Sequence, residues 1–153
     1  MRIDSIILRE IRMPLVRPFE TSFGVTRDRR IVLAEVQCEG LSGWGECTAG
    51  EHPYFSEEST DTAWEMLLNE LGPVMVADHP EHGGDCPRIF RQVRGNRMAK
   101  ATLENAIWDL EAQREGIMAL TVEQLGAQAN ALRNHFCLSE KVKVSTYSIR
   151  EFI

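Results

Sequence analysis

Two histidines, an aspartate and a cysteine lie close together near the middle of the sequence, and these residue types bind zinc in proteins. They are His79, His82, Asp85 and Cys86. Pro80 and the pair Gly83-Gly84 favour a loop here, rather than a helix that would hold both histidines on one face. No second pair of ligands stands at a suitable spacing, so we predict no metal site in this chain.

Other residue types in the chain could move a proton. Glu46 ends the segment Gly43-Trp44-Gly45-Glu46, but no second carboxylate stands at a defined spacing to divide acid and base roles with it. A structural hydrogen bond is therefore the preferred role for Glu46. Lys141-Val142-Lys143 places two amines on one face of a predicted strand, which is usually a solvated face. We predict no catalytic residue in this chain.

Two aromatic segments are the strongest candidates for contact with a ligand. Residues 17–30 contain Phe19 and Phe23, and residues 49–58 contain Tyr54 and Phe55. Glycine and proline in both segments predict loops, which are usually polar and exposed. Their aromatic side chains must therefore pack against something, either the loop's own core or a pocket that the loops help to form.

Three predicted strands precede the predicted helices. Residues 3–15 alternate between apolar and polar types, and Pro14 and Pro18 should end their regular pairing. Residues 31–38 and 41–48 are joined by the turn Glu39-Gly40, which is typical of a β-hairpin. These runs predict a three-stranded antiparallel meander.

The helices follow the meander. The first should start after Ser56 as N-cap and run to about Leu71, where Gly72-Pro73 should break or kink it. A second should run from about Arg97 to a stop at Gly116. On this helix, Trp108 should pack in the core and Asp109 should form a backbone or interdomain hydrogen bond. Residues 119–136 favour a third helix and residues 141–149 a strand. The order predicts an α+β fold, a meander followed by a helical bundle.

Composition limits the function classes. The 153 residues are 43% hydrophobic and 26% charged with a net charge of −6, which indicates a globular chain with no nucleic-acid partner and no affinity for anionic membranes. No apolar run approaches the roughly 18 residues of a membrane span. The N-terminus lacks a signal-peptide pattern, and the four cysteines lack zinc-finger or redox spacings, so we expect a cytoplasmic protein with free thiols.

Three segments in this order resemble the N-terminal capping domain of the enolase superfamily, in the mandelate racemase and muconate lactonising enzyme type. They are residues 18–24 (PFETSFG), residues 43–58 with their GWGEC and PYFSEE motifs, and residues 105–112 (NAIWDLEA). The resemblance covers about residues 2–116. It is strongest to the branch that contains o-succinylbenzoate synthase, an enzyme of menaquinone biosynthesis, and N-acylamino acid racemase.

The resemblance implies a two-domain enzyme in which the present domain covers the mouth of a modified TIM barrel. The barrel would hold a divalent metal, usually Mg²⁺, which stabilises an enolate of a small carboxylate substrate. Two lysines of the barrel would act as general base and general acid. The full enzyme can be a homo-oligomer. In such enzymes the two aromatic segments close over the substrate and exclude water. The implied substrate-binding residues are Phe19, Thr21, Ser22, Phe23, Gly50, Tyr54 and Phe55.

The barrel itself is not found in this sequence. A barrel needs roughly 200 or more residues, and the sequence departs from the family pattern immediately after Gly116. We therefore expect a capping domain over residues 1–116, followed by a non-family tail over residues 117–153 that reflects a truncation or a frameshift. The chain alone should be inactive. The alternatives are a non-catalytic fragment and a module that binds a partner chain.

Overall fold

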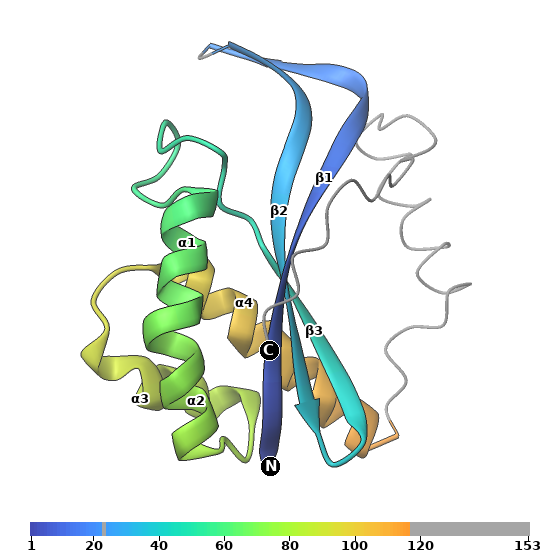
Figure 1. Ribbon diagram of the computed structural model, residues 1–153, viewed down its shortest axis with the longest axis vertical. Helices are drawn as coiled ribbons and strands as arrows, with labels where there is room; N and C mark the ends of the chain where they lie inside the picture. The colour runs from blue at the N-terminus through green and yellow to red at the C-terminus, as the bar shows by residue number, and fades with distance from the viewer. Residues whose placement is uncertain (23, 117–153) are drawn as a thin grey trace.

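The computed structural model of the chain describes residues 1–22 and 24–116. Its sheet has three antiparallel strands in the order β1-β2-β3: β1 (Ile3–Thr21), β2 (Gly24–Cys38) and β3 (Leu41–Cys47). The helices follow in the chain and cover one face of the sheet (Figure 1). The α+β architecture predicted from the sequence is therefore confirmed. The predicted helix over residues 119–136 and the predicted strand over residues 141–149 lie outside the described residues.

Strands β2 and β3 are joined by a two-residue turn. Glu39 and Gly40 have φ angles of 52° and 84°, and two successive positive φ values give the twist that suits a tight hairpin. The side chain of Asp4 accepts a hydrogen bond of 2.8 Å from the backbone N–H of Glu39. This bond ties the turn to the first strand and confirms the turn predicted at this position.

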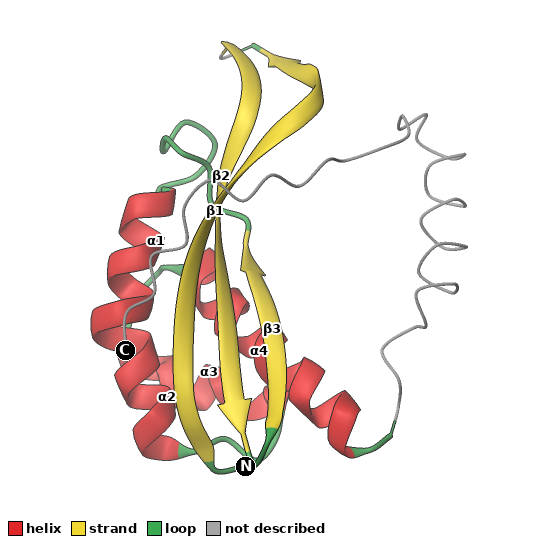
Figure 2. Cartoon of the chain, turned by 45° about the vertical axis from the view of Figure 1, so that its right-hand side comes forward, coloured by secondary structure: helices red, strands yellow, loops and turns green. Residues whose placement is uncertain are grey.

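Strands β1 and β2 extend far beyond β3 as a two-stranded arm (Figure 2). The sequence predicted a loop over residues 17–30, and that prediction is wrong. From Ser5 and Gln37, pairing is regular as far as Pro14 and Asp28, shifts register, and resumes at Phe19 and Thr26. The prolines therefore interrupt the ladder, because they cannot donate to it, but they do not end the strands.

The first helical stretch begins at α1 (Thr60–Met66), and its N-cap is Ser59, three residues later than the predicted Ser56. Ser59 and Thr62 form a reciprocal capping box: the Ser59 side chain accepts from Thr62 N–H and the Thr62 hydroxyl accepts from Ser59 N–H. A threonine hydroxyl thus takes the place of the usual Glu or Gln at the third helical position, which is why the pattern was missed.

The same stretch continues without a break through a π-helical segment η1 (Leu67–Leu71) into α2 (Gly72–Asp78). The backbone N–H of Gly72 reaches back to the carbonyl of Leu67, five residues earlier. Pro73 has no N–H to give to the carbonyl four residues before it, and one π turn accommodates that loss. The predicted break at Gly72-Pro73 is therefore a change of helical register.

Three short elements follow: η2 (Gly83–Asp85), α3 (Cys86–Ile89) and η3 (Phe90–Gln92). The long helix α4 (Arg97–Arg114) then packs against β3 and ends before Gly116, whose φ of 65° confirms the predicted stop. No helix among the described residues is long and apolar enough to cross a membrane.

The core lies between the sheet and the helices. Its strand side is made of alternate residues of β2, together with Ile3 and Leu8 of β1 and Cys47 of β3. Its helix side is made of buried residues of α1, η1, α2, α3, η3 and α4. The largest fully buried side chains are Phe90, Leu67, Leu71, Met75, Leu103, Ile107, Leu110, Val32 and Val36.

Candidate functional site

The first aromatic segment lies on the arm formed by β1 and β2. The Phe19 side chain is 62% exposed, and Ser22 is exposed at the end of the arm. The Thr21 hydroxyl donates to the carbonyl of Gly24 at 3.3 Å, across the tip. Phe23 lies outside the described residues. The segment is therefore held by a strand ladder, a firmer support than the loop that the sequence predicted.

The second aromatic segment, residues 49–58, lies between β3 and α1. Tyr54 and Phe55 are 66% and 90% exposed, so neither packs on the domain's own core. The His52 and Tyr54 rings lie 5.2 Å apart between centroids. Gly50 is exposed at the base of the segment and forms a parallel β-bridge with Ser59.

The two ends of this second segment are held together by hydrogen bonds. The backbone N–H of Thr60 donates to the carbonyl of Gly50 at 2.7 Å, and the Thr60 hydroxyl also reaches that carbonyl. Thr60 is only 1% exposed. The segment is therefore a closed loop with an ordered base, which projects its aromatic residues away from the core.

Glu58 fastens the same loop to the start of α4. Its carboxylate accepts the backbone N–H groups of Met98 at 2.9 Å and Ala99 at 3.0 Å. Asn96, the N-cap of α4, makes no side-chain capping bond, so Glu58 supplies the cap from a distant part of the chain. The sequence gives no local signal for this contact, because forty residues separate the partners.

The arm and the loop lie at the same end of the domain, away from the N-terminus (Figure 1). Ion pairs join them: Glu51 of the loop lies 3.8 Å from Arg12 and 3.9 Å from Arg30, both on the arm. Arg30 also pairs with Glu10 at 2.9 Å and with Asp61 of α1 at 2.8 Å. These two carboxylates raise the pKa of Arg30, whose charge is therefore permanent. The network thus joins the two aromatic segments to each other and to α1.

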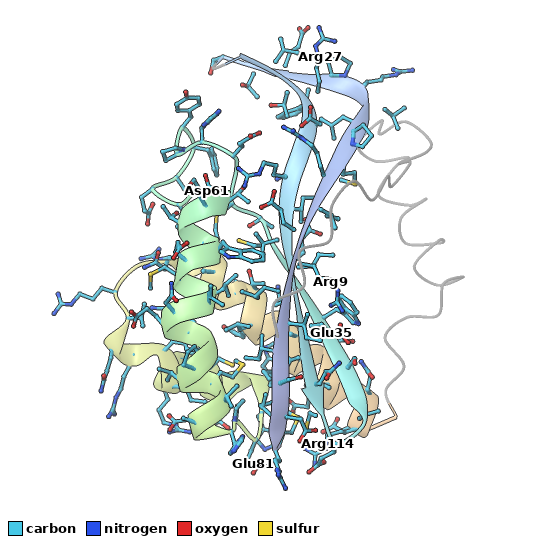
Figure 3. All side chains as sticks on the ribbon, in the orientation of Figure 1. Arg9, Arg27, Glu35, Asp61, Glu81 and Arg114 are labelled. Atoms are coloured by element: carbon cyan, nitrogen blue, oxygen red, sulfur yellow. The ribbon has the colours of Figure 1, made fainter. Side chains whose placement is uncertain are left out.

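A second polar group lies on the sheet face away from the helices. The carboxylate of Glu35, only 7% exposed, accepts hydrogen bonds from Arg9 and, at 2.9 Å, from Ser42. Burial raises the pKa of Glu35, but these donors and Gln37 outweigh it, so the net shift is downward. The Arg9 guanidinium also lies 5.2 Å from the centre of the Trp44 ring. Figure 3 shows Arg9 and Glu35 meeting from neighbouring strands.

Residues of the histidine-rich segment have structural roles: they form hydrogen bonds and ion pairs or are buried in the core. His79 accepts the backbone N–H of Ile3 at 3.1 Å, and His82 pairs with Glu111 at 3.0 Å. Cys86 is fully buried, and desolvation raises the pKa of its thiol to about 12. Among the described residues, no three side chains of the metal-binding types come together. The described residues therefore offer no ligand set for the divalent metal, which the family resemblance places in the barrel domain.

Three other side chains were assigned structural roles from the sequence. A backbone or an interdomain hydrogen bond was predicted for Asp109, and its carboxylate accepts the backbone N–H of Trp44 at 2.9 Å. Trp108 is 46% exposed and covers Gly83, so its predicted place in the core is wrong. Glu46 is exposed and forms no hydrogen bond with the described residues, so the structural bond predicted for it at the junction with another domain stays a prediction.

The chain is similar in sequence to a family of known enzymes. Residues 3–125 match the family model of the mandelate racemase / muconate lactonizing enzyme N-terminal domain. The chain is 43% identical over 118 residues to o-succinylbenzoate synthase of Geobacillus kaustophilus, covering 76% of this chain and 32% of the relative. It is 40% identical over 121 residues to N-succinylamino acid racemase of Thermus thermophilus, covering 76% and 31%.

A solved structure gives the same result. A member of the enolase superfamily from Enterococcus faecalis superposes with a TM-score of 0.69 at 36% identity, over 75% of this chain and 31% of that one. The chain thus spans about a third of the length of the curated relatives that it matches. It belongs to the mandelate racemase and muconate lactonizing enzyme family of the enolase superfamily, and the matching part is that family's N-terminal domain.

Proposed function

We propose that this chain is the capping portion of a divalent-metal-dependent enolising enzyme, with o-succinylbenzoate synthase or N-acylamino acid racemase activity. One observation carries the proposal. The arm and the loop project Phe19, Tyr54 and Phe55 from the same end of the domain with their side chains exposed, while ion pairs of Glu51 join the two segments. The similarity to a synthase and a racemase supports the choice of chemistry.

In this proposal the two segments form a lid over a carboxylate substrate bound in a separate barrel domain. Phe19, Tyr54 and Phe55 supply apolar contacts to the substrate's aryl or acyl group, and Phe23 would join them. Thr21 and Ser22 supply hydroxyl groups, and Gly50 leaves room beside the loop. Closure excludes water, which strengthens the electrostatic stabilisation of an enolate.

The chain by itself should not turn over either substrate. The reaction needs a general base, a general acid and ligands for a metal. Among the described residues, Lys100 donates its ammonium to the carbonyl of Val93, and no set of metal ligands is formed. Lys141 and Lys143 lie outside the described residues. In this proposal a barrel domain, encoded by the same gene or carried by a partner chain, supplies these groups.

An alternative is a non-catalytic fragment or a module that binds a partner chain. The observation that favours this alternative is the 90% exposure of Phe55, which leaves nearly all of its side chain open to a partner. A lid and a partner-binding surface would use the same side chains. Activity with a barrel supplied in the experiment separates the two.

A chimera tests the proposal. Residues 1–116 would replace the N-terminal domain of the synthase from Geobacillus kaustophilus, and dehydration and racemisation would both be measured with Mg²⁺. We expect activity well above that of the same barrel without a capping domain. A folded chimera that is no more active than the barrel alone would contradict the lid function and leave the partner-binding alternative. Sequencing the DNA downstream of this gene would show whether a barrel is encoded there.

A further inference from the structure

A hollow of about 310 Å³ lies beside the first half of α4, where the chain passes from α3 and η3 into that helix. Phe90 contributes to its wall and is itself only 2% exposed. Four residues of α4 line the opposite wall at spacings of three and four, which places them on one helix face: Arg97, Lys100, Ala101 and Glu104. Arg91 completes the rim from η3. This volume is at the lower end of the range of small-molecule pockets.

Positive charge gathers in this hollow although the chain carries a net charge of −6. Three of its lining side chains are cationic (Arg91, Arg97 and Lys100) and one is acidic (Glu104). Within residues 1–22 and 24–116, neither arginine forms an ion pair. Their guanidinium groups therefore remain available to a ligand.

The other two charged groups are partly engaged. The Lys100 ammonium donates to the carbonyl of Val93, which leaves two of its three N–H groups free to point elsewhere. Glu104 accepts a long hydrogen bond of 3.4 Å from the indole N–H of Trp108 and stands one helical turn after Lys100. The carboxylate offsets one of the three positive charges, so the hollow keeps an excess of two.

We propose that this pocket binds a small organic dianion, with two carboxylates or a phosphate on a short apolar body. The two guanidinium groups, one from each wall, suit the paired acceptor oxygens of carboxylate or phosphate. Pro87 and Ala101, which are both exposed, offer apolar contact to the body of the ligand. The two net positive charges match a dianion better than a monoanion. The pocket shares no residue with the proposed lid, so it is independent of the proposed function.

Calorimetric titration of the 153-residue chain tests this site. The probes are glutarate, a dicarboxylate, and glycerol 3-phosphate, with propionate as the monoanion control at constant ionic strength. We expect at least one dianion to bind with one site per chain, with propionate at least about tenfold weaker. The stronger of the two dianions identifies the preferred anionic group. Failure of both dianions to bind, or equal binding of propionate, would overturn the proposal.

Matched variants locate the binding. The double variant Arg91→Gln with Arg97→Gln should bind the dianion at least about tenfold more weakly, because each substitution removes a charged hydrogen-bond donor. Arg88→Gln is the control, because Arg88 stands on α3 outside the pocket and lies 4.0 Å from Asp85. Circular dichroism would verify that both proteins keep their helices. Equal loss in the control, or undiminished binding in the double variant, would show that general charge and not this pocket holds the anion.

Discussion

The main-chain carbonyl of Thr102 occupies the space beside Gly45 where the Cβ atom of any other residue would stand. Gly43 has the same relationship with the carbonyl of Ala106, one helical turn further along α4. Strand β3 therefore meets the helix backbone to backbone along two alternate positions. This close approach fixes the position of α4 on the sheet. The start of α4 in turn binds the Glu58 carboxylate of the second aromatic loop.

Gly45→Ala should consequently destabilise the domain. The added methyl group would overlap backbone on a buried helix, which cannot move aside as a flexible side chain can, and such overpacking costs about 1–3 kcal/mol or more. Urea unfolding would measure the change in the free energy of unfolding. Gly84→Ala is the control, because a Cβ at Gly84 meets nothing within 4 Å, and its effect should stay within about 0.5 kcal/mol. Similar losses in the two variants would contradict the close-packing argument.

Glu58→Ala should weaken the link between the aromatic loop and α4. The buried backbone N–H of Ala99 would lose the hydrogen bond that it donates to the Glu58 carboxylate. An unsatisfied buried donor costs about 1–3 kcal/mol. Loss of the carboxylate also removes a favourable charge at a helix N-terminus. Urea unfolding measures the change, with Glu57→Ala at the exposed neighbouring position as the control. An equal effect at the two positions would contradict the capping role.

The sequence alone was sufficient for the order of the strands, the turn at Glu39-Gly40 and the extent of α4, because these depend on local patterns. Alternation of apolar residues, a glycine in a tight turn and a glycine after a helix each act within a few residues. Residues 17–30 were misjudged for the same reason. Their prolines and glycine indicate a loop locally, whereas pairing between residues far apart makes them strands.

The candidate site was only partly predictable. Exposed aromatic residues in two segments were evident from the sequence, and the structure places the described ones at one end of the domain. Glu51 and Glu58, which join those segments to the arm and to α4, were not identified. Isolated carboxylates in a polar loop carry no periodic signal, and their partners lie on other elements. Trp108 was misjudged because an indole on a helix usually enters the core, whereas here it covers a glycine at the surface.

The ion pair of His82 and Glu111 should make stability depend on pH. The Glu111 side chain raises the pKa of His82 above 6.5, so the protonated histidine stabilises the fold below that pH, and the gain is lost as the pH rises through the raised pKa. The N–H of Gly83, and then His82, lower the pKa of Glu111 below 4.5, so its contribution is present above that pH and lost in acid. The contact should therefore stabilise most between pH 4.5 and 6.5.

Thermal unfolding of the chain and of His82→Gln, from about pH 4 to about pH 9, measures this dependence. The advantage of the unaltered chain should be largest near the middle of that window and should shrink toward both ends. His52→Gln is the control, because His52 is exposed and forms no ion pair with the described residues. A pH-independent difference for His82→Gln would show that the ring contributes only packing.

Phe55→Ala tests the lid in the chimera described above. Phe55 is 90% exposed, so its loss should change the free energy of unfolding by no more than about 0.5 kcal/mol. If it contacts the substrate's apolar group, kcat/KM should fall about tenfold or more, which is the usual cost of one lost apolar contact. Leu68→Ala is the matched control, because Leu68 is an exposed apolar residue on η1, away from the arm and the loop. Equal activity of the Phe55 variant and the unaltered chimera would remove Phe55 from the substrate pocket.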